Sequence, residues 1–304
     1  MIAFVSRENI DDAKWDAVVA NSWHETVYGY CWYLDCVTPQ WGGLVLDDYK
    51  AVMPLVIGKK WGFKYIFNVP FMQYTTVYGA LPTTLVLNQF LEAIPHKFRF
   101  MDFKLLFPHE PQIKDAEVLN CTNYILQIPD NASAIDAKFN TNTKRNIKKA
   151  EKLGLTFTFE SNPDKLIETY KVFKKEKYNT VSDPKIYERL RKAITKALIN
   201  GSGQLVYAWN SEGNFLGGTF FQDSLTRSIY LFSGASAACK NTGAMFLIVK
   251  NRMLEMLDSN KVIDFEGSDI EGIARFYKGF GAEPLRYYRI KINKLPKPIY
   301  WLKR

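Results

Sequence analysis

The sequence has no long apolar run. Its 304 residues contain no stretch of about 18 consecutive apolar side chains, and a helix that spans a membrane needs about 20. The first residues, Met1-Ile-Ala-Phe-Val-Ser-Arg-Glu8, lack the basic start and the apolar core of a signal peptide. We therefore expect a cytoplasmic protein without a membrane span.

Cysteine and histidine are scarce, with four and three residues respectively. No C-x-x-C pair occurs, and no histidines stand at metal-ligand spacing beside the cysteines, so we expect buried reduced thiols and no metal site. No Ser-His-Asp or Cys-His arrangement marks a nucleophile. The seven residues are Cys31, Cys36, Cys121, Cys239, His24, His96 and His109.

Two glycine-rich phosphate motifs are also missing. The spacing G-x-x-x-x-G-K-[ST] is absent, and so is G-x-G-x-x-G. The first absence means that the chain has no Walker A loop, and the second disfavours dinucleotide binding. Any phosphate site must therefore be built in another way.

Acidic residues are outnumbered in one part of the chain only. Residues 1–130 hold 10 Lys and Arg against 14 Asp and Glu, a net charge of −4, whereas residues 131–304 hold 30 against 17, a net charge of +13. This asymmetry favours an anionic partner for the second part: a phosphorylated cofactor, a nucleic acid or an acidic surface. The alternative is that surplus lysine only keeps the protein in solution.

The material for a folded core is present, since 47% of the residues are hydrophobic and 15% aromatic. Ile128-Pro-Asp-Asn131 interrupts the pattern and predicts a boundary between domains 1–130 and 131–304. In the first domain the patterns predict a strand followed by a helix from Asn9, a hairpin over Trp41–Lys60, a helix over Thr84–His96, and strands over Arg99–Phe107 and Asn123–Ile128.

Aromatic residues crowd the stretch from Trp61 to Tyr78. Such a stretch is more often core than site, but Gln73 and the tyrosines put polar tips on apolar bodies, as the wall of a cleft does. We therefore keep Gln73 and Tyr74 as candidate substrate-binding residues.

A basic helix is predicted over residues 139–153, ended by Gly154. Phe139, Ile147, Ala150 and Leu153 share its apolar face. The cations on the other face are either a solvated surface or a wall for phosphates or a polyanion. They are Lys144, Arg145, Lys148, Lys149 and Lys152.

The rest of the second domain alternates helices and strands around one crossover unit. The patterns predict a strand over Leu155–Glu160, helices over Pro163–Lys177 and Asp183–Asn200, and strands over Gln204–Asn210, Asn214–Gln222 and Arg227–Ser233. They then predict a helix over Ala244–Leu257, a strand over Lys261–Glu266, a helix over Asp269–Lys278 and a last strand over Leu285–Ile292.

The loop before the Ala244 helix is a candidate phosphate site. A helix N-terminus presents unpaired N–H groups and a partial positive charge. Gly243 permits close approach of the backbone, and Lys240 adds charge. We predict cofactor binding by Cys239, Lys240, Asn241, Thr242, Gly243 and Ala244. An ordinary helix start is the alternative.

The segment after the crossover carries candidate catalytic groups. Strand alternation predicts that Asp264 and Glu266 share one face. A carboxylate at a strand end beside a cleft can act as a general base. Tyr277 on the following helix can act as a general acid. A cap, a surface charge or an interfacial tyrosine is the alternative for each.

The basic stretch Lys144-Arg-Asn-Ile-Lys-Lys-Ala-Glu-Lys-Leu-Gly154 and the stretch from Asp264 to Gly281 together resemble the GNAT acyltransferase superfamily. More closely, the chain resembles the Fem-type and related tandem "acetyltransferase (GNAT) domain" proteins. The resemblance covers roughly residues 135–292 by motif and the first domain by architecture. It implies an α/β fold of two GNAT-like units, each a mixed, mostly antiparallel sheet flanked by helices. The first unit would be degenerate and would serve as an acceptor pocket.

The resemblance also implies an activity: an N-acyltransferase that moves an acyl group from acyl-CoA, such as acetyl-CoA, to an amine by direct attack. Tyr277, four residues before Gly281, would protonate the departing thiolate. Fem-type ligases instead use aminoacyl-tRNA on cell-wall precursors and usually show Phe-Lys where this chain has Phe276-Tyr277, which favours acyl-CoA over tRNA. A non-catalytic GNAT-like binding protein remains a third alternative.

Overall fold

The computed structural model describes residues 1–60, 62–79, 82–178, 183–267 and 270–296. Trp61 and Asp269, where the predicted last helix begins, lie outside these residues. The chain divides into two compact units, Met1–Thr122 with Arg286–Arg304 and Asn123–Leu285. This division differs from the predicted boundary at residue 130. It falls inside strands β6 (Glu117–Gln127) and β12 (Glu283–Asn293), and an uninterrupted strand carries no turn signal that a sequence could show.

The sheet of unit 1 has the strand order β1-β2-β3-β4-β5-β12. Neighbouring strands are antiparallel, apart from the parallel pair of β4 and β5. The predicted hairpin is confirmed: β2 and β3 are joined through Asp47, whose φ of 49° suits an aspartate in a tight turn. Besides β12, the strands of this sheet are β1 (Ile2–Ser6), β2 (Trp41–Leu46), β3 (Ala51–Lys60), β4 (Phe63–Phe67) and β5 (Phe100–Leu105).

The described residues of unit 1 also form the α-helices α1 (Asp12–Ala20), α2 (Cys31–Val37) and α3 (Thr84–Glu92), with short 3-10 turns at Arg7–Asn9 and Val27–Gly29. The side chain of Thr83 accepts a hydrogen bond from the Val86 N–H, which caps α3. Leu87 and Phe90 of α3 are fully buried in a core that includes Phe103 and Ile290 of the sheet.

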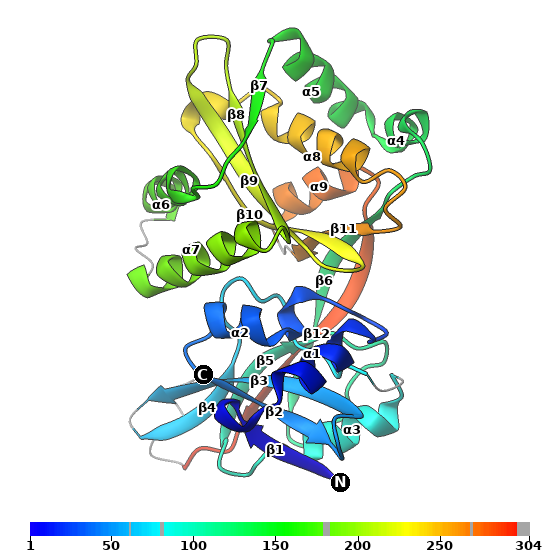
Figure 1. The fold of residues 1–304 in the computed structure, drawn as a ribbon, viewed down its shortest axis with the longest axis vertical. Coiled ribbons are helices and arrows are strands. Elements are labelled where there is room, and N and C mark those ends of the chain that lie inside the picture. The colour runs from blue at the N-terminus through cyan, green and yellow to red at the C-terminus, as the bar shows by residue number, and fades with distance from the viewer. Residues whose placement is uncertain (61, 80–81, 179–182, 268–269, 297–304) are drawn as a thin grey trace. The chain divides into compact units, whose positions relative to one another are not determined.

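The sheet of unit 2 has the order β6-β11-β10-β9-β8-β7. Its pairs are antiparallel except β10 with β11, which are parallel and therefore need a crossover. Helix α8 supplies it (Figure 1). The strands are β7 (Thr156–Phe159), β8 (Gly203–Trp209), β9 (Phe215–Asp223), β10 (Arg227–Ala235) and β11 (Val262–Gly267), and α8 is Ala244–Glu255.

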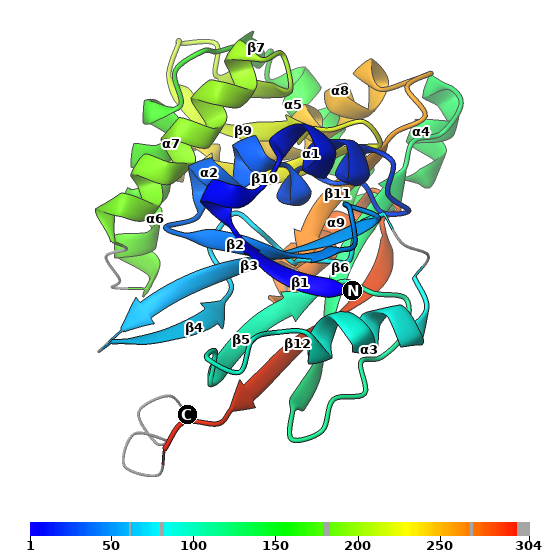
Figure 2. The same ribbon diagram turned by 60° about the horizontal axis from the view of Figure 1, so that its bottom comes forward.

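Helices cover both faces of this sheet, as Figures 1 and 2 show. One face carries α6 (Asp164–Tyr178) and α7 (Pro184–Ile199), and the other carries α8, α5 (Thr141–Lys152) and α9 (Glu271–Gly279). The basic helix predicted from Phe139 is α5, which begins after Asn140, whose side chain caps it by accepting from the Thr143 N–H at 2.8 Å; α4 (Ala132–Lys138), which the patterns did not predict, ends before Phe139. No helix in the described part of the chain is long and apolar enough to cross a membrane.

Helix α5 packs closely on the start of α8 and the end of α9. A Cβ atom at Gly243 would lie 2.1 Å from the carbonyl oxygen of Asn146, and one at Gly279 would lie 2.4 Å from the Thr143 hydroxyl. The Asn140 N–H donates to the Gly279 carbonyl at 3.0 Å. Both glycines are therefore required by the approach of α5.

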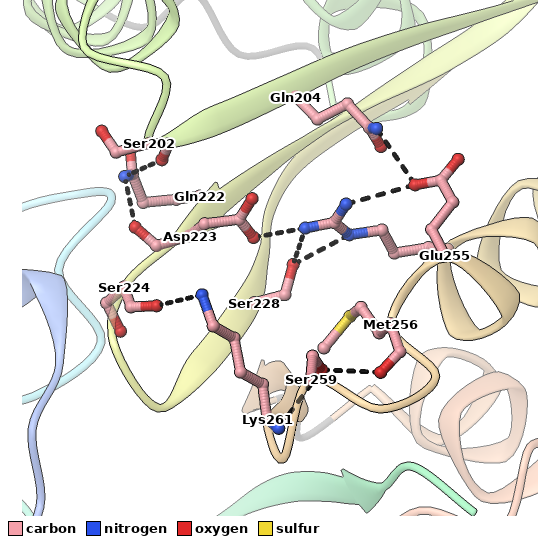
Figure 3. Close-up of polar contacts among 11 residues, drawn as sticks. Ser202, Gln204, Gln222, Asp223, Ser224, Ser228, Glu255, Met256, Ser259 and Lys261 are labelled. Atoms are coloured by element: carbon pink, nitrogen blue, oxygen red, sulfur yellow. Dashed lines mark hydrogen bonds and ion pairs between the residues drawn. The ribbon is translucent and has the colours of Figure 1, made fainter. Parts of the chain in front are cut away.

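The other end of α8 is fastened by a polar cluster (Figure 3). The guanidinium of Arg252 donates to the carboxylate of Asp223, to the hydroxyl of Ser228 and to Glu255. Gln204 reaches the same Glu255 carboxylate at 3.0 Å. The cluster ties the helix to the neighbouring strands β8, β9 and β10.

Candidate functional site

Strands β10 and β11 diverge within unit 2. Their parallel register joins Arg227–Ile229 to Val262–Asp264, and β10 then continues to Ala235 while β11 continues to Gly267. The pairing of β10 with β9 shifts between Tyr230 and Phe232, which marks a β-bulge at the same level. Bulges re-aim the backbone and are frequent beside active sites. This divergence defines the candidate site.

Asp264 lies at the point where the strands separate, and its side chain is 1% exposed. Its Oδ2 accepts from the Arg227 guanidinium at 3.0 Å, and its Oδ1 accepts from the Asn123 amide at 2.9 Å. A carboxylate with both oxygens engaged by buried donors is poorly placed to take a proton from a substrate. Asp264 links its own strand to β10 and β6 through these two contacts, and its role as the base stays a prediction that this geometry does not favour.

Glu266 does not alternate with Asp264 in the way a regular strand predicts. The register of β11 with β6 shifts between Asp264 and Gly267, and Glu266 has a φ of 58°. A left-handed conformation is costly for a residue with a side chain and is often found at functional sites. The Glu266 N–H donates to Asp264 Oδ1 at 2.9 Å, so the buried carboxylate stabilises this backbone. Glu266 is partly exposed and is the better candidate base.

Tyr277 on α9 lies against β11 in an aromatic layer. Its ring stacks on Phe265 with centroids 4.6 Å apart, and it also meets Tyr124 and Tyr230. Burial raises the pKa of the Tyr277 hydroxyl well above its ordinary value, and the charges of Glu266 and Asp264 raise it further. The hydroxyl carries a proton at neutral pH, as an ordinary tyrosine does, and the raised pKa makes it a weaker acid than an exposed tyrosine.

Several backbone donors of the predicted phosphate loop and of the start of α8 are engaged within the chain. The Ala244 N–H donates to the Thr242 hydroxyl at 3.2 Å, the Met245 N–H to the Cys239 thiol, and the Phe246 N–H to the Gly243 carbonyl at 3.0 Å. Burial also raises the pKa of Cys239, so this sulfur remains a neutral thiol. In this structure the start of α8 offers these groups to the chain itself and not to a ligand.

A pocket of about 730 Å³ adjoins the same loop. It lies between α6 and the end of β10, and it includes Cys239 and Lys240 of the predicted site but not Asp264, Glu266 or Tyr277. Val172, Phe173 and Met245 give it an apolar wall, and Lys165 stands at its edge, held over the Trp209 ring at 4.3 Å. Its volume suits a small-molecule site.

The basic face of α5 is as predicted: Lys144, Arg145 and Lys148 are exposed, while Ile147 and Ala150 are buried. Gln73 and Tyr74 belong to unit 1. Gln73 donates to the Tyr287 hydroxyl at 2.6 Å, and Tyr74 is fully buried with its hydroxyl 2.9 Å from His24 Nε2. Tyr74 is thus a core residue in this unit, and the prediction that it contacts substrate has no support from its position.

Sequence reasoning missed two residues that define the site, Arg227 and Asn123. Arg227 begins β10, and Asn123 lies in β6 next to Thr122; both are buried. Buried polar groups need partners, but a strand of mixed polarity does not show which of its polar residues are buried. A local pattern could also not have named Asp264 as the partner, because Asn123 and Asp264 are far apart along the chain.

The geometry of unit 2 defines the class of fold: a bulged strand, a crossover helix, and a second strand that leaves the first. Unit 1 likewise has one parallel pair, β4 and β5, with α3 between them in the chain, and the chain has a tandem GNAT-like fold, mixed α/β and mostly antiparallel within each unit. The prediction of a GNAT-superfamily, Fem-like fold is confirmed.

Solved structures of the same fold cover nearly the whole chain. A structure described as FemX superposes with a TM-score of 0.69 at 12% identity, covering 97% of this chain and 98% of its own. The C-terminal domain of a putative lysylphosphatidylglycerol synthetase from Agrobacterium fabrum gives 0.59 at 10%, covering 98% and 96%. A tandem GNAT protein from the clavulanic acid biosynthesis pathway gives 0.53 at 9%, covering 98% and 100%. At these identities the likeness is one of fold. No model of a protein family matches the sequence, and no curated protein matches it either.

Proposed function

We propose that the chain is an acyltransferase that moves an acyl group from a carrier to an amine. The observation that carries this proposal is the divergence of β10 and β11, with Glu266 and Tyr277 beside it. Such an opening exposes backbone next to a bulge, where a carbonyl can be positioned and its developing charge stabilised. Proteins with the same fold include one described as a putative lysylphosphatidylglycerol synthetase and one described as a tandem GNAT protein, which supports a reaction of this class.

In the proposed reaction the amine attacks the carbonyl carbon of the donor directly. Glu266 accepts a proton from the attacking amine, the carbon–sulfur or carbon–oxygen bond of the donor breaks, and the departing atom takes a proton from Tyr277. Arg227 and Asp264 act indirectly: Arg227 donates to Asp264, which accepts from the Glu266 N–H and so positions Glu266.

We propose acyl-CoA as the donor, with its thioester arm in the pocket between α6 and β10. The apolar wall of Val172, Phe173 and Met245 suits an aliphatic arm, and Lys240 and Lys165 provide positive charge for phosphates. The N–H groups of Ala244 and Phe246 at the start of α8 are engaged within the chain. We therefore expect the phosphates to contact Lys240 and Lys165 and not the N-terminus of α8.

Isothermal calorimetry with acetyl-CoA tests this donor. We expect binding that Lys165→Ala/Lys240→Ala weakens by roughly a hundredfold, since each of the two charged hydrogen bonds contributes about 1.5 kcal/mol. Lys185→Ala, which removes an exposed lysine of α7 outside the pocket, should leave the affinity unchanged. The absence of heat with acetyl-CoA and longer acyl-CoAs would exclude acyl-CoA.

A second donor is favoured by one observation. Helix α5 packs on the start of α8 through Asn146 and Ala150, while its cations Lys144, Arg145 and Lys148 are exposed. A row of exposed cations suits a polyanion better than a single diphosphate. Aminoacyl-tRNA is therefore the second candidate, with a cell-wall precursor amine as acceptor. Filter binding of tRNA should then fall steeply with salt, and Lys144→Gln/Lys148→Gln should reduce the slope of log K against log salt by about 1 to 2. A slope that these substitutions leave unchanged would exclude α5 as a tRNA contact.

A further inference from the structure

A separate pocket lies in unit 1, on the side of helix α3. It is bounded by α3, the segment that follows it, the loop after β5 and the end of β12, and its volume is about 360 Å³. That volume is within the range of sites for small ligands. Apolar side chains form its floor, and the acyl-transfer proposal makes no use of it. They are Leu91, Ile94, Phe98, Met101, Ile113 and Ile292.

The rim of this pocket is positively charged. Arg99, Lys114 and Lys294 line it and are exposed, together with His96, against a single carboxylate, that of Glu92. Within the described residues none of these three cations has an ion-pair partner. The three cations come from separate segments of unit 1, and the Lys294 N–H donates to the Arg99 carbonyl, which fixes two of those segments together. Such a convergence of cations favours an anionic ligand.

A second observation concerns Asn88 on α3. Its side-chain oxygen is buried and has no hydrogen-bond partner among the residues that the structure describes, and the residue lines the pocket. A buried acceptor without a donor is unfavourable and asks for an explanation. A ligand that brings an N–H or O–H group to this oxygen would satisfy it.

We propose that this pocket binds a small organic anion that carries an N–H or O–H donor close to its anionic group, of the kind found in N-acylated amino acids. The carboxylate or phosphate lies at the rim with Arg99, Lys114 and Lys294, the donor meets the Asn88 oxygen, and the apolar part rests on the floor. This site is independent of the acyl-transfer site in unit 2.

The test compares two probes that differ in a single donor. N-acetylglycine has a carboxylate and an N–H group, whereas N-acetylsarcosine has a methyl group in place of that hydrogen. Ligand-observed NMR titration of the full chain should show N-acetylglycine binding roughly fivefold to tenfold more tightly. Glycerol 3-phosphate serves as the phosphate probe, and binding of it alone would assign the anion as a phosphate.

Three variants locate the binding. Arg99→Gln should weaken the probe that binds by about tenfold. Lys64→Gln removes one exposed positive charge of the same unit, on β4 outside the pocket, and should leave binding unchanged. Asn88→Leu should abolish the difference between N-acetylglycine and N-acetylsarcosine. Unchanged thermal unfolding midpoints verify that the variants fold.

Three results would overturn the proposal. The first is the failure of all three probes to saturate at millimolar concentration. The second is an equal loss of affinity in Arg99→Gln and Lys64→Gln, which would indicate attraction by net charge alone. The third is a preference for N-acetylglycine that survives in Asn88→Leu.

Discussion

Two arginine–aspartate pairs lie at consecutive residues of β10 and differ in burial and in what they hold together. Arg227 of β10 pairs with Asp264, and these side chains are 8% and 1% exposed. The next residue, Ser228, accepts from Arg252 of α8, which pairs with Asp223; these two side chains are 11% and 22% exposed. The first pair connects three strands and continues to the strained backbone of Glu266. The second fastens a helix end (Figure 3). The same kind of ion pair thus shapes a site where it is buried and supports packing where it is partly exposed.

The largest effect is expected from Asp264→Ala. Removing one partner of a buried ion pair leaves the other charge uncompensated and costs about 3 to 5 kcal/mol. Urea unfolding should show this loss, and the double variant Arg227→Met/Asp264→Leu should recover most of it. A loss below about 1 kcal/mol would mean that the two pairs do not differ in the way proposed.

A smaller effect is expected from Arg252→Met. The Arg252 side chain and its partners keep some contact with water, so the loss of this cluster should cost about 1 to 2 kcal/mol. The same urea series measures it. Acyl transfer should persist in this variant, whereas Asp264→Ala should abolish it, because only the first pair supports Glu266.

The pH dependence of unfolding in Tyr277→Phe tests whether Tyr277 is buried, separately from its role as an acid. Burial raises the pKa of Tyr277 above its ordinary value of 10.0, so its contribution to stability is fully present below about pH 10 and is lost as the pH rises further, when the unfolded tyrosine ionises first. The loss is about 1.4 kcal/mol for each pH unit. The variant should lose less stability than the wild type between pH 10 and 11.

The matched control for that measurement is Tyr65→Phe, at a partly exposed tyrosine of unit 1. It shows how much of any change comes from the loss of one tyrosine hydroxyl. If Tyr277→Phe follows the wild type, the ring is open to solvent and cannot be the buried acid.

The smallest effect on stability is expected at Glu266. Glycine tolerates the φ of 58° without a side-chain penalty, so Glu266→Gly should change the free energy of unfolding by less than about 1 kcal/mol and in the stabilising direction. Both Glu266→Gly and Glu266→Gln should lose acyl transfer. If Glu266→Gly destabilises the protein, the backbone at Glu266 is not strained. If either variant keeps full activity, Glu266 is not the general base.

The sequence predicted the elements of unit 2 well because its helices and strands carry clear periodicity and end at glycine or asparagine. Asn140 and Asp183 cap helices at the N–H groups expected of them. It also placed Tyr277 on the helix after the second strand. These are local properties, which short stretches of sequence determine.

What the sequence could not predict depends on distant residues. The strand alternation that grouped Asp264 with Glu266 failed because a bulge intervenes. Gly243 looked like a phosphate-loop glycine, yet it is required by the backbone of Asn146 on another helix. Arg227 and Asn123 became visible as parts of the site only when the fold brought them to Asp264.

Unit 1 is assembled from two separate lengths of chain, with the whole of unit 2 between them. During synthesis β5 therefore emerges long before β12, its antiparallel neighbour, and the core that contains Ile290 and Ile292 is incomplete until the last strand leaves the ribosome. Unit 2 is contiguous and can fold first. The N-terminal unit is thus expected to be the last to reach its native state, with an unpaired strand edge exposed in the meantime.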